Sequence, residues 1–583
     1  LNQTCLPPIE AFNSWLKNSK MDPKNYKILQ NKWVELGWTC VKDLLAWYNS
    51  LDVIGFVRAV KKHSQYFYDQ YGVDLFKDFC SISSFALYEA MGSAQGWDPT
   101  KEIFVNICEH DLYHKFRTFA GGYSGPFKCR YHERDITKID DRFVKFVRSY
   151  DCNAMYLGCA MSVMPVGDYS VSNPTAYTAM EMINNDWFGF MEVDIYTPDS
   201  AKPYFSRVGV APIFQKKTFV ASKSNVGEYM WGLRKDFGDA KPPKTTKLLN
   251  SFYGNHILLY SPLLKWYLEH GLLIGKCYQA IKFESGHPFK SFGENISNSR
   301  RLGTVEIDGK YPYELRGQTD KLIGNFYGKC GENLGKHKKT FYCTEFKKDL
   351  MALKNDFVEA KPFGDTFCVS RRKRRVVWNR AIQVATAVYN LAKLNYLKFV
   401  FECIDRVPLY EDGGRRVEVC YGDTDSCWIA STEEIGELHK YFPDKSWFPS
   451  KSEEIVTVIE DHPITKRQFE SKTPLKWKEE YTGHVGIWVK SKSYYADGPD
   501  GTKMSCKGAM KHIVEEQKQL KQEFLDMIFT REDKPTVECV NRGFKFKKGL
   551  GMTSYEQQRA FLSYWYDKSI VLEDQCHLKI TPL

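Results

Sequence analysis

The sequence lacks the hydrophobic and cysteine patterns that mark several classes of protein. No stretch approaches the roughly 18 apolar residues of a membrane span, and no basic segment followed by an apolar one opens the chain as a secretory leader would. The 17 cysteines are scattered singly, without a Cys-x-x-Cys pair, which argues against a zinc ribbon or a disulfide framework. We therefore expect an intracellular protein with reduced thiols and no membrane partner, in the nucleus or the cytoplasm.

Positive charge is in small excess over negative charge, and aromatic residues are plentiful. Lys and Arg number 82 against 71 Asp and Glu, which gives a net charge of +11 over 583 residues. This balance permits nucleic acid as a partner without requiring it. Aromatic residues make up 15% of the chain. They stack on nucleobases but also fill hydrophobic cores, so composition alone decides little.

The order of helical and strand-like patterns indicates the fold class. Helical spacing of apolar residues dominates 1–115. The same spacing predicts three further helices, at 262–270, 318–326 and 380–403. Alternating apolar and polar residues predict three strands, at 145–151, 187–197 and 416–421. Because helices and strands interleave without the regular order of a parallel sheet, we expect an α+β protein.

The segment Tyr421-Gly-Asp-Thr-Asp-Ser426 has the most specific chemistry in the sequence. Strand-like residues flank it, so it is predicted to form the tip of a hairpin. Two acids at i and i+2 on an extended segment face the same side, which would place the carboxylates of Asp423 and Asp425 together. Mg²⁺ binds carboxylate oxygens and keeps room for water and substrate phosphates. A solvated turn is the alternative for this segment alone.

Asp151 supplies a third acid, at the end of the strand predicted over 145–151. On its own such an Asp is usually a cap or a turn residue. If the strands of Asp151 and Asp425 are adjacent, the two carboxylates would make a two-metal site. In such a site the ions lie roughly 4 Å apart and clamp the attacking and leaving oxygens of a displacement at phosphorus.

With these motifs the sequence resembles the family B DNA polymerases, and more closely their protein-primed branch of phages, linear plasmids, adenoviruses and Maverick/Polinton elements. The segment 421–426 matches the family's third polymerase motif in full. The segment that begins at Asp151 matches the first motif, normally Asp-x-x-Ser-Leu-Tyr-Pro, with Ala154 in place of Ser and Leu157 in place of Pro. The resemblance implies a right-hand polymerase with palm, fingers and thumb.

The resemblance also implies a role for each matching residue. Asp151, Asp423 and Asp425 would be catalytic, with Asp151 and Asp425 binding two Mg²⁺ ions, which Mn²⁺ can replace, and Asp423 assisting. The ring of Tyr156 would lie beneath the deoxyribose and exclude a 2′-hydroxyl group.

The family's fingers motif, Lys-x-x-x-Asn-Ser-x-Tyr-Gly, has two candidates, because the negative triphosphate requires a lysine. One candidate keeps Lys321 and Asn325 at i and i+4 on one helical face, followed by Tyr327 and Gly328. Tyr327 stands one residue closer to Asn325 than in the family, which would rotate its side chain by roughly 100° on a continuous helix.

The other candidate, 247–254, keeps the Asn-Ser-x-Tyr-Gly wording but places Lys247 only three residues before the Asn. It leads directly into a stretch that precedes the fingers in the resembling proteins, so chain position favours Lys321. Both stay open at this point. Arg300 and Arg301 are interpreted as solvated surface rather than as phosphate ligands.

Two short motifs match the family's contacts with primer and template DNA. Lys492-Ser-Tyr494 matches a Lys-x-Tyr motif that touches the primer terminus, and on an extended segment these two side chains share a face. Phe119-x-Gly121-Gly122 resembles a Tyr-x-Gly-Gly loop, in which glycine lets the backbone approach the template. Gly328 of the fingers motif is assigned to the DNA as well. The basic run 371–375 has three open interpretations: phosphate contacts, a nuclear-import signal or a solvated loop. A second basic run, 543–548, would suit the backbone of duplex DNA.

Tyr48-Asn-Ser-Leu-Asp52 matches the Tyr-x-x-x-Asp motif of the family's proofreading 3′–5′ exonuclease. The residues before Tyr48 contain no Asp-x-Glu, and the first residue is Leu1 rather than Met. We therefore interpret the sequence as a fragment that begins inside its exonuclease domain and lacks exonuclease activity. An ordinary helix surface is the alternative for this motif.

The resemblance implies six segments in chain order. They are a truncated exonuclease-type domain at 1–115, a first palm part with a terminal-protein-region-like insertion at 116–285, fingers at 286–330, a second insertion at 331–378, a second palm part at 379–510 and a thumb at 511–583.

The function that the resemblance implies is DNA-directed DNA polymerase activity in protein-primed replication of a virus, plasmid or mobile element. The expected partners of a monomeric enzyme are template–primer DNA, deoxynucleoside triphosphates and a terminal protein that provides the first hydroxyl. A catalytically decayed, DNA-binding remnant is the alternative, and a reverse transcriptase is a weaker one.

Overall fold

The structure, a computed structural model, divides the chain into two compact units. It describes residues 1–79, 81–94, 103–234, 242–507, 514, 519–530, 536–547 and 551–579. The first unit holds Leu1–Phe85, Gly508–Leu520 and Val537–Phe561, and the second unit holds the rest. The limits that we expected at 115 and 511 are therefore not the limits of these units. The expected mixture of helices and strands is confirmed.

Helices dominate the first unit, as the sequence predicts for its N-terminal residues. After α1 (Pro23–Glu35) comes α2 (Val41–Tyr71), which starts with a capping box between Cys40 and Asp43 and ends at Gly72 in the left-handed conformation. Edge-to-face aromatic contacts join the end of α2 to the segment that follows it, through Phe67, Tyr71, Phe79 and Phe85. The strands β23 (Thr536–Lys547) and β24 (Gly551–Ser563) pair with each other.

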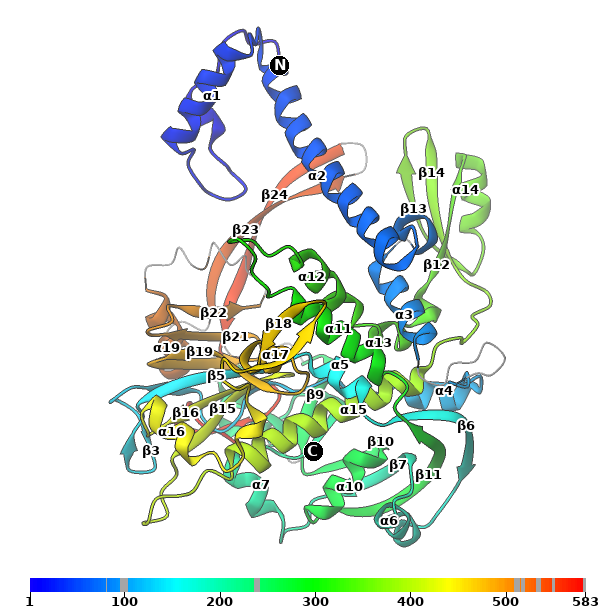
Figure 1. Ribbon diagram of the computed structural model, residues 1–583, viewed down its shortest axis with the longest axis vertical. Coiled ribbons are helices and arrows are strands. Elements are labelled where there is room, and N and C mark those ends of the chain that lie inside the picture. Colours follow the sequence, from blue (N-terminus) through cyan, green and yellow to red (C-terminus); the bar gives the residue numbers. More distant parts are fainter. Residues whose placement is uncertain are drawn as a thin grey trace. The chain divides into compact units, whose positions relative to one another are not determined.

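A five-stranded antiparallel sheet forms the centre of the second unit (Figure 1). Its order is β1-β15-β16-β5-β19, with bounds Ser124–Pro126, Val417–Asp423, Ser426–Ser431, Phe146–Cys152 and Trp477–Gly483. The strands predicted at 145–151 and 416–421 are thus β5 and β15. The long helix predicted at 380–403 is also present, as α15 (Ile382–Lys398) continued by one π-helical segment, Phe399–Ile404.

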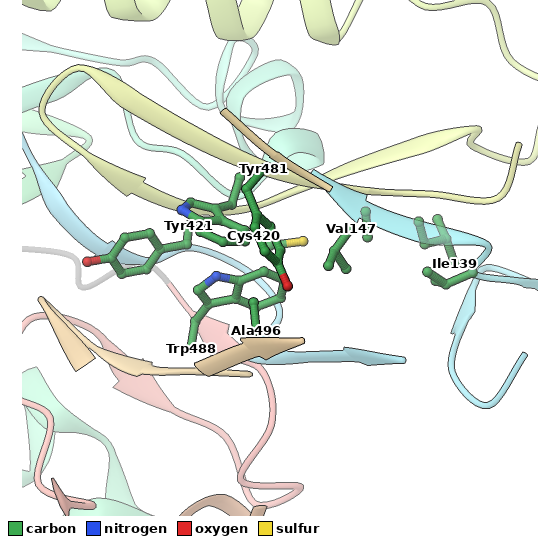
Figure 2. Packing of buried hydrophobic residues seen from close by; sticks show 10 residues of the cluster. Ile139, Val147, Cys420, Tyr421, Tyr481, Trp488 and Ala496 are labelled. Atoms are coloured by element: carbon green, nitrogen blue, oxygen red, sulfur yellow. The ribbon is translucent and has the colours of Figure 1, made fainter. Parts of the chain in front are cut away.

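A second antiparallel sheet, β2-β20-β21-β22, packs against the five-stranded sheet. Its bounds are Tyr131–Glu133, Val485–Lys490, Ser493–Asp497 and Lys503–Cys506. Trp488 and Ala496 from this sheet meet Val147, Cys420 and Tyr421 from the other in one buried cluster (Figure 2). Burial of each large apolar side chain contributes about 1.5–3 kcal/mol, so this core fixes the strands that carry the candidate acids.

The segments between the core strands form sheets of their own. One has the order β10-β7-β11-β6, with bounds Tyr253–Tyr260, Gly189–Tyr196, Leu273–Gly286 and Met164–Ser172. The predicted strand at 187–197 is β7, and the predicted helix at 262–270 is α10 (Ser261–Glu269). Another has the order β12-β14-β13, with bounds Lys338–Cys343, Thr366–Arg372 and Phe357–Phe363.

Two helices, α11 (Lys290–Leu302) and α12 (Glu314–Ile323), pack side by side, green in Figure 1. Their close approach depends on Gly303 and Gly317, since a Cβ atom on either would lie 3.2 Å from the Cα of the other. The helix predicted at 318–326 ends early, at Ile323, and α13 (Tyr327–Cys330) follows separately. Within the described residues, no helix combines the length and apolarity needed to cross a membrane.

Candidate active site

The tip of the β15–β16 hairpin and the end of β5 bring the predicted acids together. Ser426 pairs with Asp151 across the sheet, and the Cys152 N–H donates to the carbonyl of Asp425 at 2.8 Å. The predicted hairpin is therefore present, and so is the adjacency of strands on which the two-metal interpretation depends. The extended geometry expected for Asp423 to Asp425 is wrong, because Thr424 has φ 65° and the chain turns there.

The turn gives the two hairpin acids different neighbours. Asp425 lines a cleft together with Asp151. Asp423 is paired with Lys492, whose Nζ lies 3.0 Å from Asp423 Oδ2. Asp423 is therefore the less available of the three carboxylates.

Burial and mutual repulsion make the carboxylates of Asp151 and Asp425 hard to ionise. Burial raises the pKa of Asp151 to about 7, with further contributions from the charges of Asp425 and Glu480. Burial also raises the pKa of Asp425, and the charges of Asp423 and Glu480 act in the same direction. A divalent cation between such groups would stabilise their charged forms, so the donor set suits Mg²⁺.

The cleft that holds the two acids has a volume of about 320 Å³ and is also lined by basic residues. Its size falls within the range of small-molecule sites. Arg300 from α11, Lys321 from α12, and Lys472 line it. Burial and then the charges of Arg300, Lys478 and Lys321 lower the pKa of Lys472. These basic side chains line the same cleft as the acids, and together they suit the binding of a polyphosphate.

Three tyrosines form one aromatic cluster beside the acids. The rings of Tyr156 and Tyr327 stack with centroids 4.6 Å apart and an angle of 19°, and Tyr389 meets both edge-on. The rotation that we expected for Tyr327 assumes a continuous helix. The helix breaks at Gly324 instead, and the new helical turn that starts at Tyr327 brings its ring back onto Tyr156.

Lys321 and Lys247 lie in different kinds of structure. Lys321 is in the last turn of α12 and lines the cleft together with Asn325, whose side chain donates to the Lys321 carbonyl at 3.3 Å. Lys247 is on a strand, β9 (Lys244–Ser251), and pairs with Asp567 at 2.9 Å. Only Lys321 combines a helix with a place beside Asp151. Gly328 lies in α13, and a Cβ atom added to it would meet open space.

Contacts within the protein require glycine at one of the two positions of the glycine loop, Gly122. A Cβ atom on Gly122 would lie 2.7 Å from the Cα of Thr424, at the turn between the two hairpin acids. Gly121 has open space in the same position. Phe119 stacks on Tyr389 with centroids 4.6 Å apart, which anchors the loop beside the tyrosine cluster.

Lys492 and Tyr494 do not share an extended strand. Lys492 is in the turn between β20 and β21 with φ 57°, so the predicted extended geometry is wrong. Its backbone N–H donates to the hydroxyl of Tyr421 at 2.9 Å. Tyr494 packs against Tyr421 and Trp428, with centroids 5.5 and 5.3 Å apart.

The remaining motifs are distant from the acids in sequence, and each has contacts of its own. Tyr48 and Asp52 are exposed on α2, and an exonuclease origin for this helix stays a prediction. Arg371 and Arg374 pair with Asp356. In the basic run 543–548, the residues to Lys547 continue β23, and Lys548 lies outside the described residues.

Similarity to known proteins is found in structure rather than in sequence. No protein-family profile matches the chain, and no curated protein sequence matches it. The orthorhombic crystal form of phi29 DNA polymerase aligns with a TM-score of 0.50 and 13% identity, over 86% of this chain and 70% of that one. Its ternary complex with primer-template DNA and incoming nucleotide substrates aligns with a TM-score of 0.48 and 14% identity, over 84% and 69%.

The chain has a DNA polymerase-like fold.

Within this polymerase-like fold, the sequence pattern missed several charged residues of the cleft. The interpretation of Arg300 and Arg301 as solvated surface is wrong: Arg300 lines the cleft, and Arg301 is buried, with its guanidinium on the ring of Phe469. Lys478 and Glu480 also line the cleft, from alternate positions of β19. Their spacing at i and i+2 was the one available signal, since neither belongs to a motif and no strand was predicted there.

Proposed function

We propose that this chain is a DNA-directed DNA polymerase that extends a 3′-hydroxyl group with deoxynucleotides. The observation that carries the proposal is the joint cleft, in which Asp151 and Asp425 face Lys321 and Arg300. Acids on one side and cations on the other match the needs of a metal-bound triphosphate. The polymerase-like fold supports the same reading.

Asp151 and Asp425 would hold two Mg²⁺ ions, which Mn²⁺ can replace. When bound, these ions supply charge stabilisation for the attacking and leaving oxygens. Lys321 and Arg300 would bind the phosphates of the deoxynucleoside triphosphate and orient them. Tyr156 would support the sugar from below and, with Tyr327 stacked on it, leave no room for a 2′-hydroxyl group.

Primer extension on a template–primer duplex tests this function. The purified chain should extend the primer in the presence of Mg²⁺ or Mn²⁺, and Asp425→Asn should lose that activity while still binding DNA. The substitution keeps the shape of the side chain and removes a charge that burial disfavours, so we expect the variant to fold. Wild-type protein that binds DNA but extends no primer would identify the chain as the decayed remnant.

We propose further that replication starts from a terminal protein, in the manner of the protein-primed branch. The segments 165–285 and 329–370 would form the surfaces for this protein and for strand displacement. These segments form two separate sheets, β10-β7-β11-β6 and β12-β14-β13. Both sheets are inserted in the chain between β5 and β15 of the five-stranded sheet, which supports this assignment. Transfer of a labelled deoxynucleotide to a co-purified protein, in a product resistant to nuclease and sensitive to protease, is the expected result. A requirement for a nucleic-acid primer under all conditions would contradict it.

A further inference from the structure

A second group of metal-ligating side chains lies behind the five-stranded sheet. One ligand atom each from Cys129, His132 and Glu418 lies within 4.8 Å of the other two. All three residues are buried, with exposed fractions of 4%, 2% and 7%. Within the described residues, no other three of the Cys, His, Asp and Glu side chains come together in this way.

A second thiol, that of Cys576 in the C-terminal segment, lies beside Cys129 and outside the group of three. The Arg130 N–H donates to the Cys576 carbonyl at 3.1 Å and Cys129 pairs with His577, so the two segments lie antiparallel. This pairing places Cys576 Sγ 3.9 Å from Cys129 Sγ. Two thiolates on one tetrahedral zinc ion, with Zn–S bonds of about 2.3 Å, are roughly 3.8 Å apart. The observed separation therefore fits a shared zinc ion.

The hydrogen bonds around His132 orient its ring as a metal ligand. Thr137 Oγ1 donates to the Glu133 carbonyl at 3.1 Å, so it has an acceptor site for His132 Nδ1–H, 3.0 Å away. This arrangement leaves His132 Nε2 facing Glu418 Oε2 at 3.0 Å. Metal-bound histidines typically donate their second ring N–H in this way.

Glu418 is itself held by a cation on its other side. Arg415 Nη1 lies 3.1 Å from Glu418 Oε1, so Oε2 is the oxygen turned to His132. Without a metal, this contact is a buried hydrogen bond between His132 and Glu418. In that alternative the Cys129 thiol has the Tyr131 carbonyl at 3.2 Å as its acceptor, but the second thiol beside it, that of Cys576, has no role.

We propose that Cys129, His132 and Glu418 bind a structural Zn²⁺ ion and that Cys576, beside Cys129, closes the site as the fourth ligand. Four protein ligands of these types leave no open position for a substrate, as is usual for structural zinc. The site would tie the C-terminal segment and the approach to β2 onto β15, the strand that ends at Asp423. It does not depend on the polymerase function proposed above.

Metal analysis of the purified full chain tests the site directly. After dialysis against buffered Zn²⁺ in excess Mg²⁺, the wild type should retain one zinc ion per chain, and Co²⁺ in its place should give a thiolate-to-cobalt absorption band. Cys129→Ser and Cys576→Ser should each lose the band, whereas Cys108→Ser, at an exposed cysteine, should keep it. Wild type without stoichiometric zinc, or variants that retain it equally, would overturn the proposal.

Two further measurements cover variants that fail to fold and the disulfide alternative. Thr137→Val leaves every ligand in place and removes the hydrogen bond to His132, together with the two bonds between Thr137 Oγ1 and the Glu133 backbone. It should weaken zinc affinity by about 10- to 100-fold. Mass spectrometry after thiol alkylation should find Cys129 and Cys576 both reduced. A disulfide between them, or unchanged zinc affinity in Thr137→Val, counts against the site.

Discussion

The ammonium group of Lys492 lies 3.1 and 3.0 Å from the two carboxylate oxygens of Asp423. The left-handed turn at Lys492, held by its N–H bond to Tyr421, aims the side chain at the hairpin tip. This ion pair neutralises Asp423 within the protein. A primer phosphate would compete with Asp423 for the same lysine, which links DNA binding to the charge of the site.

Replacement of Lys492 by Met should separate these two roles. If Lys492 binds a primer phosphate, the slope of log affinity against log salt concentration should fall by about 0.9, because one phosphate contact is lost. Fluorescence anisotropy with a labelled template–primer duplex measures this slope. Lys440→Met, at an exposed lysine of α16 (Ile435–Tyr441) that pairs with Glu437, is the matched control and should leave it unchanged. An unaltered slope in Lys492→Met would restrict the lysine to its pair with Asp423.

Lys321→Met should reduce kcat/KM for deoxynucleoside triphosphates by about 100-fold, because it removes a cation aimed at the developing phosphate charge. Lys247→Met should change it little, since Lys247 is on β9 and pairs with Asp567. Steady-state primer extension with varied nucleotide concentration measures both. A larger loss in the Lys247 variant would reverse the assignment of the fingers helix.

Tyr156→Ala should admit ribonucleotides, because the ring that fills the space beneath the sugar is gone. We expect discrimination against ribonucleotides to fall by at least about 10-fold, since steric exclusion in such a pocket is worth roughly 1–3 kcal/mol. Tyr156→Phe keeps the stack on Tyr327 and should keep the discrimination. Competition between labelled ribo- and deoxynucleotides gives the ratio, and an equal ratio in both variants would count against the role of the ring.

Asp151→Asn should flatten the dependence of stability on pH in metal-free buffer. The folded-state pKa of Asp151, about 7, lies above its ordinary value of 3.8. Folding thus favours the protonated carboxyl group. Its contribution to the free energy of unfolding is complete below pH 3.8 and is lost as the pH rises through 7. After allowance for partial exposure, the loss is on the order of 1–2 kcal/mol. Asp199→Asn, at an exposed acid whose pKa Lys202 lowers, should not flatten the curve. Chemical denaturation between pH 4 and 8 tests this, and equal slopes in wild type and Asp151→Asn would contradict it.

Gly122→Ala should destabilise the protein by about 1–3 kcal/mol, the usual cost of overpacking, and should displace the turn at Thr424. Gly121→Ala is the natural control, because its new methyl group meets open space. Thermal unfolding and primer extension of the two variants give the comparison. Similar behaviour of both would show that the loop yields without disturbing the hairpin.

The sequence predicts the parts of this site that depend on strand patterning and on spacing along one segment. It anticipates the hairpin at 421–426, since alternation and turn residues specify it. The pairing of this hairpin with the strand of Asp151 was only a condition of the two-metal interpretation, because local patterns do not specify pairing between distant strands. It does not anticipate the left-handed conformation of Thr424 or of Lys492. Left-handed backbone at residues other than glycine is set by surrounding contacts rather than by local preference.

The remaining differences arise from contacts between residues far apart in the chain. Arg300 follows no motif and enters the cleft because α11 packs beside α5 (Met155–Met161), the helix of Tyr156. Tyr327 stacks on Tyr156 because the helix ends at Gly324 and a new helical turn starts at Tyr327. A rotation calculated from residues per turn assumes an unbroken helix and so misses this change. The proposed zinc ligands show the same limit, because Cys129 and Cys576 come from nearly opposite ends of the second unit's sequence.

The pairing of Ser426 with Asp151 joins two strands separated by nearly half of the chain. The entropy lost when a loop closes grows only logarithmically with its length, at about 0.6 kcal/mol for each doubling. Lineages could therefore gain or shed whole folded inserts between these strands with little effect on the pairing that aligns the two acids. Because contacts between residues far apart in the chain form slowly, we expect the site to assemble late in folding.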